Sequence, residues 1–257
     1  MTVIFIFIFG LIIGSFLNAV ICRLKENEQF VRGRSKCPYC RHSLGFWDLI
    51  PLASFIFLKA RCRYCHKKIS WQYPLVELAT ALVFTIGYFH YQFPNYLITL
   101  LPYYLIYLVF SCFLIIIFVY DLKHYLILDK VTLPALILAL ALNFLLGLSI
   151  INLLIAALVA AGFFFLQFIV SKGKWIGGGD LRLGLVMGAM LGWPKVALAL
   201  MLAYVLGAAI GIFLIILKKK QLNSPMPFGT FLSLGTWVAL LWSEEIWHFY
   251  SSIISNK

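Results

Sequence analysis

Three glycines and one aspartate, Gly177, Gly178, Gly179 and Asp180, lie between two strongly apolar segments. A carboxylate at membrane depth is costly, so an acid in this position indicates a functional site. The glycines allow backbone, or an extended substrate, to approach the acid closely. Asp is also a favoured N-cap, so Asp180 alone is equally compatible with a residue that only begins the next helix. A second carboxylate decides between the two interpretations, and Asp121 is the best candidate.

Two carboxylates that share a proton form a general acid–base pair, in which one acid stays protonated while the other activates water. Peptide hydrolysis requires that combination, and Asp121 and Asp180 are the pair we expect to provide it. The sequence also permits Asp129 as the partner of Asp180, and permits proton-relay acids of a transporter. Glu77 is open to two interpretations, an interfacial carboxylate paired with a local Arg or Lys, which we favour, or a site residue.

Four cysteines form two Cys-x-x-Cys pairs, Cys37 with Cys40 and Cys62 with Cys65, separated by 21 residues. This spacing is typical of a four-thiolate zinc site, at the long edge of the usual range. Two disulfides or four unliganded thiols are the alternatives, and a reducing cytoplasm disfavours the disulfides. We expect the four thiolates to hold one structural zinc ion.

The composition is that of a membrane protein. Of 257 residues, 63% are hydrophobic and 12% are charged, and the mean hydropathy is +0.98. Apolar runs of nearly 20 residues indicate several transmembrane helices. The net charge of +12 would suggest nucleic acid in a soluble protein, but here the basic residues cluster in particular loops, where membrane topology explains them. We therefore expect lipid, and no nucleic acid, around this chain.

We predict an all-α membrane protein with eight spans. They lie at about residues 2–21, 73–91, 96–120, 131–148, 150–170, 181–193, 196–217 and 230–250.

Basic residues set the predicted orientation. Residues 23–72 carry eleven Lys and Arg against three acids, which places them in the cytoplasm. With eight spans and both termini outside, every Lys and Arg except Lys195 and Lys257 is then cytoplasmic, and Asp121 and Asp180 share that face. The domains are a first transmembrane helix (1–22), a cytoplasmic four-cysteine domain (23–72) and a transmembrane core (73–257).

Several motifs occur in a fixed order, and together they resemble the signatures of the type IV prepilin peptidase family, bifunctional leader peptidases and N-methyltransferases. The motifs are Gly14-Ser15-Phe16-Leu17-Asn18, Cys37-Pro38-Tyr39-Cys40, Trp47-Asp48-Leu49-Ile50-Pro51, Arg61-Cys62-Arg63-Tyr64-Cys65, Tyr73-Pro74-Leu75-Val76-Glu77, Asp121 with Asp129, Gly177-Gly178-Gly179-Asp180 and Pro227-Phe228-Gly229. Lys25 and Leu128 stand where the family commonly has Pro, and Arg182 where it often has Lys. None of these departures removes a matched acid or thiolate.

The resemblance implies an aspartic endopeptidase of the bacterial inner membrane. Its dyad would be Asp121 and Asp180, with Gly177 and Gly179 completing the Gly-x-Gly-Asp motif. It would cut prepilins or pseudopilins after a glycine at the cytoplasmic face, and would methylate the new N-terminus with S-adenosylmethionine. A protease confined to cleavage, and a proton-coupled transporter or scaffold, are the alternatives. No feature of the sequence sets an oligomeric state.

Overall fold

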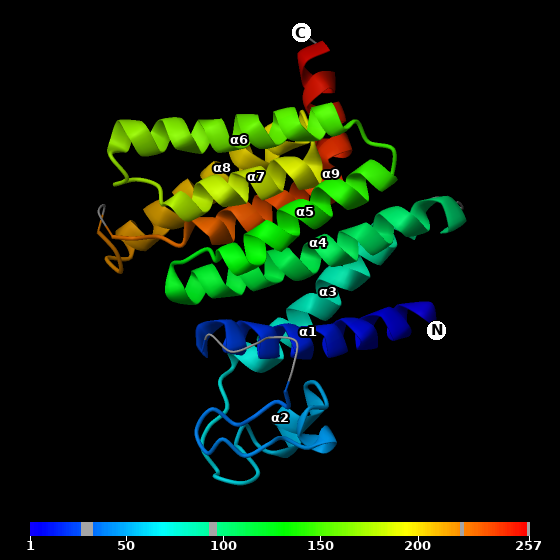
Figure 1. Cartoon of the computed structure of the whole chain (residues 1–257), viewed down its shortest axis with the longest axis vertical. Coiled ribbons are helices and arrows are strands. Elements are labelled where there is room, and N and C mark those ends of the chain that lie inside the picture. The colour runs from blue at the N-terminus through cyan, green and yellow to red at the C-terminus, as the bar shows by residue number, and fades with distance from the viewer. Residues whose placement is uncertain (27–32, 93–96, 222–223, 256–257) are drawn as a thin grey trace. The chain divides into compact units, whose positions relative to one another are not determined.

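The computed structural model describes residues 1–26, 33–92, 97–221 and 224–255. Within these ranges the chain is helical, and its only extended pairings are isolated bridges that join Lys36 to Ser43 and Arg61 to Lys68. The helices of Figure 1 are α1 (Thr2–Glu26), α2 (Ala53–Phe57), α3 (Gln72–Gln92), α4 (Leu97–His124), α5 (Asp129–Leu145), α6 (Ile150–Ser171), α7 (Gly178–Leu191), α8 (Lys195–Ile216) and α9 (Phe228–Ser255), with a 3-10 turn at Phe46–Asp48.

A long helix corresponds to each of the eight apolar segments predicted from the sequence. Four of these helices, α1, α4, α6 and α8, are long and apolar enough to cross a membrane. The prediction of an all-helical membrane protein is therefore confirmed at this level. Short α2 lies between the two cysteine pairs and was not predicted.

Several helix boundaries differ from the predicted spans, and two of these differences concern the acids. Helix α4 continues to His124, so Asp121 lies inside the helix, because the amide of Tyr125 still bonds to the carbonyl oxygen of Asp121 at 2.8 Å. Helix α7 begins at Gly178, so Asp180 lies in its first turn and the N-cap is Gly177. The interpretation of Asp180 as the N-cap residue is therefore wrong.

The chain divides into two compact units, Met1–Ile116 and Ile117–Lys257. In the first, α1 packs on α3 around Asn18, which is buried. The Asn18 Nδ2 donates to the carbonyl oxygen of Tyr73 at 3.0 Å, and its Oδ1 accepts from Gln72 Nε2 at 3.2 Å. Such amide contacts join helices where water is absent.

In the second unit, α7 is the helix against which the others pack, with α5, α6, α8 and α9 all in contact with it. The α6–α7 interface is so close that a Cβ atom on Gly188 would lie 2.3 Å from the Cα of Ala157. The buried Asn143 of α5 donates to the carbonyl oxygens of Ala189 and Met190 at 2.7 and 3.1 Å. These contacts fix α7, and hence Asp180, within the unit.

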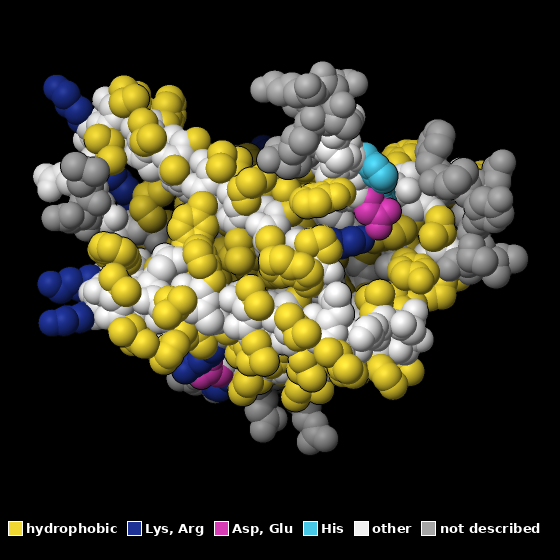
Figure 2. All heavy atoms as spheres, turned by 90° about the horizontal axis from the view of Figure 1, so that it is seen from above, with side chains coloured by type: hydrophobic (Ala, Val, Ile, Leu, Met, Phe, Trp, Pro, Cys, Tyr) yellow, Lys and Arg dark blue, Asp and Glu magenta, His cyan; other side chains and the backbone are white. Residues whose placement is uncertain are grey.

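Hydrophobic side chains cover most of the face in Figure 2, and several visible Lys and Arg side chains gather at one end of it. Large apolar residues of α6, such as Leu158, Leu166 and Val170, are between 65 and 71% exposed. A soluble protein rarely leaves so much contiguous apolar surface in water. Lipid tails are the natural partner of this surface, and the chain is a multi-pass membrane protein.

The close α6–α7 packing yields a stability prediction. Gly188→Ala should lower the free energy of unfolding by about 1–3 kcal/mol, because the new methyl group overpacks the interface. Gly162→Ala is the matched control, since a Cβ there meets nothing within 4 Å and Ala favours a helix. Thermal unfolding in detergent measures both. Equal melting temperatures for the two variants would contradict the packing described.

Candidate active site and cysteine cluster

Asp121 lies near the end of α4 and is only 4% exposed. Its Oδ2 accepts a hydrogen bond from the backbone amide of Thr230 at 2.9 Å, and the amide of Gly229 is a second donor. Both amides belong to the first turn of α9, where backbone N–H groups have no partner within the helix. The beginning of α9 therefore holds the Asp121 carboxylate. The Pro227-Phe228-Gly229 motif marked this helix start, but sequence reasoning gave it no role.

Asp180 lies in the first turn of α7 and is 9% exposed. Its Oδ2 accepts a hydrogen bond from the amide of Gly177 at 3.1 Å, and its own amide donates to the carbonyl oxygen of Gly177 at 3.2 Å. Gly177 has extended backbone, with φ −81° and ψ 157°. The carboxylate is thus fixed by the turn that precedes it, which accounts for one part of the glycine-rich motif.

The two acids come together around Ile127. A Cβ on Gly179 would lie 2.9 Å from the Cβ of Ile127, and a Cβ on Gly229 would lie 2.9 Å from its Cδ1. Gly179 is the residue directly before Asp180. The Cβ on Gly229 would in addition lie 3.0 Å from Asp121 Oδ2. The charge of Asp121 also acts on Asp180. Both glycines are required because any side chain would displace Ile127, and at Gly229 it would displace the acid as well.

The oxygen Oδ2 of each acid binds a backbone amide, that of Thr230 for Asp121 and that of Gly177 for Asp180. One oxygen of each carboxyl group therefore fixes the side chain. The other oxygen can exchange a proton with water or a peptide group. This arrangement suits a pair of acid–base groups.

Asp129, the alternative partner of Asp180, opens α5 without capping it. The N-cap is Leu128, and Asp129 is the first residue of the helix. Its carboxylate pairs with Arg182 near the start of α7, and both side chains are about half exposed. Asp129 is therefore occupied by an ion pair, in contrast to the buried Asp121 and Asp180.

Glu77 is buried, and the preference for an ion pair with a local Arg or Lys is wrong. Its Oε2 accepts a hydrogen bond from the amide of Leu52 at 2.9 Å, and Ser15 also bonds to it. Among the described residues, Glu77 forms no ion pair. Leu52 has φ 57°, so its amide is held in an unfavourable backbone conformation that this bond helps to fix. Glu77 thereby ties the segment between the cysteine pairs to α3.

The four cysteines of the two pairs gather in one cluster. The sulfur atoms of Cys37, Cys40, Cys62 and Cys65 all lie within 4.8 Å of one another, and Cys37 and Cys65 are 3.9 Å apart. Zinc–sulfur bonds of 2.3 Å in a tetrahedron separate sulfur atoms by about 3.8 Å. The donor set therefore fits a single tetrahedral metal ion.

Each cysteine pair lies on a backbone turn of the same form. The amide of Cys37 bonds to the carbonyl oxygen of His42 at 3.0 Å, as the amide of Cys62 bonds to that of Lys67 at 2.9 Å. The residue after each pair has positive φ, 57° at Arg41 and 56° at His66. The two turns correspond by a shift of 25 residues. Both thus present their thiols in the same way.

Hydrogen bonding also favours the thiolate form of Cys37. Burial raises the pKa of this thiol, but the amides of Cys40 and Tyr39 donate to it and lower its pKa to about 7.

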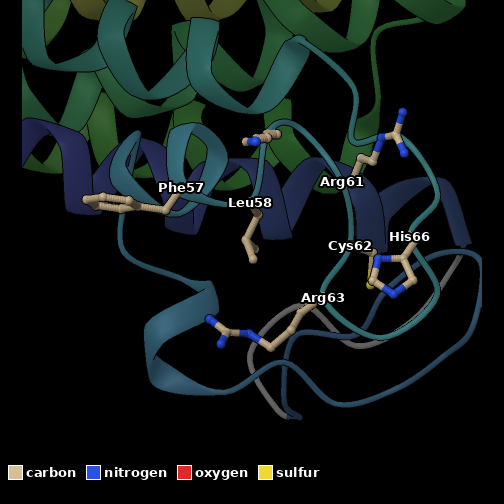
Figure 3. Close-up of a pocket in the computed structure, with 7 residues that line it drawn as sticks. Phe57, Leu58, Arg61, Cys62, Arg63 and His66 are labelled. Carbon is tan, nitrogen blue, oxygen red and sulfur yellow. The ribbon is translucent and has the colours of Figure 1, made fainter.

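A hollow of about 550 Å³ adjoins Cys62. It is lined by Phe57, Leu58, Lys59, Arg61, Cys62, Arg63 and His66. Figure 3 shows that the basic side chains do not converge, because Arg61 and Arg63 point in different directions. The Arg63 guanidinium instead bonds to Asp48 Oδ1 at 2.7 Å. The hollow is therefore basic but lacks a common point at which a ligand group would be held.

Comparisons with known proteins match nearly the whole chain. Residues 8–91 match the Bacterial Peptidase A24 N-terminal domain, and residues 108–212 match the Type IV leader peptidase family. A prepilin leader peptidase/N-methyltransferase of Aeromonas salmonicida is 34% identical, over 97% of this chain and 94% of its own. One from Bacillus subtilis is 35% identical, over 95% and 96%, and one from Pseudomonas putida is 30% identical, over 93% and 90%.

No solved structure matches the chain. The cysteine cluster lies within the first matched domain, and both aspartates of the buried pair lie within the second. Since the relatives align along nearly their full lengths, this chain belongs to the type IV leader peptidase family.

Proposed function

We propose that this chain is an aspartic endopeptidase that removes the basic leaders of prepilins and pseudopilins and N-methylates the new N-terminal residue. The observation that carries the peptidase function is the meeting of Asp121 and Asp180, two buried acids on separate helices. The family assignment agrees with this function and does not favour a transporter, a scaffold or an enzyme confined to cleavage.

Hydrolysis would use the two Oδ1 atoms. One carboxylate takes a proton from water, whose oxygen then bonds to the scissile carbonyl carbon. The other acid gives its proton to the amide nitrogen as the carbon–nitrogen bond breaks. Backbone amides at the starts of α7 and α9 hold the two Oδ2 atoms during the reaction. Asp121 and Asp180 are thus proposed as the catalytic residues, with Gly177 and Gly179 in support.

The methyl donor implied by the relatives' names is S-adenosylmethionine, which supplies an electrophilic methyl group on a sulfonium ion. The hollow beside Cys62 does not fit this donor, because its lining offers no carboxylate to a sulfonium and its basic side chains do not converge on one point. We therefore assign no residue to the donor and derive no step through it.

We infer that the four thiolates hold zinc, which the tetrahedral spacing of their sulfur atoms supports. The ion would fold residues 23–72, whose described part has few buried apolar residues, with Cys37 and Cys62 the buried members of the cluster. Its role there is structural, since four protein ligands leave no open position for a substrate.

We further propose eight spans in a bacterial inner membrane, with both termini outside. The eight long helices support this number, and the distribution of Lys and Arg supports the orientation. Residues 1–22 then form the first span, 23–72 the cytoplasmic four-cysteine domain, and 73–257 the transmembrane peptidase core.

The acid pair gives the first functional prediction. Asp121→Asn and Asp180→Asn should each lower the rate of leader cleavage by about 10²–10⁴-fold, because Asn cannot exchange the proton. The double variant should be no slower than either single one, since the two acids act as a unit. The assay is a gel shift of a prepilin in detergent, with Glu244→Gln as the control. Normal cleavage by Asp180→Asn would exclude the aspartic mechanism.

Metal content gives the second prediction. Purified protein should contain about one zinc ion per chain, and Cys62→Ser should remove it and lower the melting temperature more than it slows cleavage. Cys112→Ser should retain the ion, because Cys112 lies on α4 away from the cluster. Elemental analysis without stoichiometric metal, together with alkylation of all four thiols, would refute the zinc site.

Membrane topology gives the third prediction. A cysteine placed at Lys219 should resist a reagent confined to the outside and react once the membrane is permeabilised. A cysteine at Lys195 should react directly, because it lies on the opposite face. Direct labelling at Lys219 would disprove the proposed orientation.

A further inference from the structure

Residues 125–128, called the strap below, join α4 to α5 beside the two acids. The strap begins at the residue that carries one acid, since the amide of Tyr125 bonds to the backbone carbonyl oxygen of Asp121 at 2.8 Å. It ends at Leu128, whose carbonyl oxygen accepts from the amides of Val131 and Thr132 at 3.0 Å each. Both ends of this short loop are therefore anchored by backbone hydrogen bonds.

Ile127 is the part of the strap that reaches both acids. Its Cβ faces Gly179, the residue before Asp180, and its Cδ1 faces Gly229, whose amide bonds to Asp121. The side chain is half-buried, and it fills the distance between the two glycine positions. A shift of Ile127 would therefore change the contacts behind both carboxylates at once.

A second connection runs through Asp129, the residue that follows the strap. Its ion pair with Arg182 joins the first turn of α5 to the N-terminal part of α7. Arg182 is two residues beyond Asp180, just as Asp129 is two residues beyond Ile127. The pair thus holds the strap against the turn that carries the second acid.

We propose that Ile127 and the Asp129–Arg182 pair are positioning residues that set the separation of the two catalytic carboxylates. This inference rests on the proposed peptidase function. Nothing in it requires Ile127, Asp129 or Arg182 to touch the substrate. They act by fixing where α4, α7 and α9 present Asp121 and Asp180.

The size of the effect follows from two opposing facts. A misplacement of about 1 Å at a catalytic group can cost about 10²-fold in rate. An exposed ion pair, however, contributes little energy, and the strap keeps its backbone anchors without it. Removing the pair should therefore slow catalysis without abolishing it, and should hardly affect the stability of the fold.

The test is a double-mutant cycle with the full-length enzyme in detergent and a purified prepilin as substrate. Asp129→Asn and Arg182→Gln should each lower kcat about tenfold and leave KM within about twofold. The double variant should be no slower than the slower single variant, because both remove one interaction. Arg182→Lys should restore most of the rate, since it keeps the charge.

A matched control exists in the same unit. Lys195 and Glu244 form an exposed ion pair at 2.9 Å, away from the acids. Lys195→Gln and Glu244→Gln should leave kcat unchanged within about twofold. Melting temperatures of all variants should agree closely, so that a loss of kcat cannot be ascribed to unfolding.

Ile127 provides an independent arm. Ile127→Ala should lower kcat about tenfold, and Ile127→Val less, because Val loses only the Cδ1 methyl that faces Gly229. Leu133→Ala, which shortens an exposed apolar side chain on α5, should have no effect.

Several results would overturn the inference. These are a normal kcat in the Asp129 and Arg182 single variants, a double variant whose loss is the product of the two single losses, or an effect on KM alone, which would indicate substrate contact. Loss of cleavage in Asp180→Asn beside any of these results would leave the proposed peptidase function intact. Normal cleavage in Asp180→Asn would overturn both.

Discussion

Two carboxylic acids buried in an apolar helical bundle must have hydrogen-bond donors, because burial without partners costs several kcal/mol for each group. In this protein the donors are backbone amides, from Thr230 and Gly229 for Asp121 and from Gly177 for Asp180. Within a helical bundle, the starts of helices supply amides without a helical partner, and they also carry partial positive charge. The acids are therefore compatible with this bundle because α7 and α9 both begin beside them.

That constraint explains why glycines surround the acids. Amide donors can reach a carboxylate only where the helix start comes close to it, and Gly229 allows this approach to Asp121. The same closeness at Gly179 leaves room for the side chain of Ile127. The contacts of α7 with its neighbouring helices also help to position Asp180, because a helix start can hold an acid accurately only if the helix itself is fixed. Asn143 and the close packing at Gly188 provide that fixation.

Much of this could be predicted from the sequence. Apolar length located the eight long helices, and glycines beside an acid identified Asp180 as a candidate. Cysteine spacing likewise predicted the cluster, because metal ligands in knuckles lie close along the chain. These features are local, or depend on composition, so they leave a visible pattern.

What could not be predicted depends on contacts distant in sequence. Ile127 is one apolar residue among many, and only its position between two glycines distinguishes it. The ion pair of Asp129 was not predicted, because its partner, Arg182, lies 53 residues away. Glu77 likewise looked interfacial, although its partner is a backbone amide at Leu52, which carries no signal in the side-chain sequence. The predicted end of α4 was wrong for a similar reason, since hydropathy does not reveal that a helix continues one turn past an acid.

The equivalence of the two cysteine turns has a consequence for how the small domain would respond to loss of a metal ion. Each turn is closed by its own backbone hydrogen bonds, between residues no more than nine apart, such as Leu44 to Ser35 and Ile69 to Ala60. The backbone closure of each turn is therefore local, and the part left to the ion is to join the two turns. Without the ion the thiol corner of the domain would loosen, whereas residues 45–59 would still be held by the contacts of Asp48 with Arg63 and of Leu52 with Glu77.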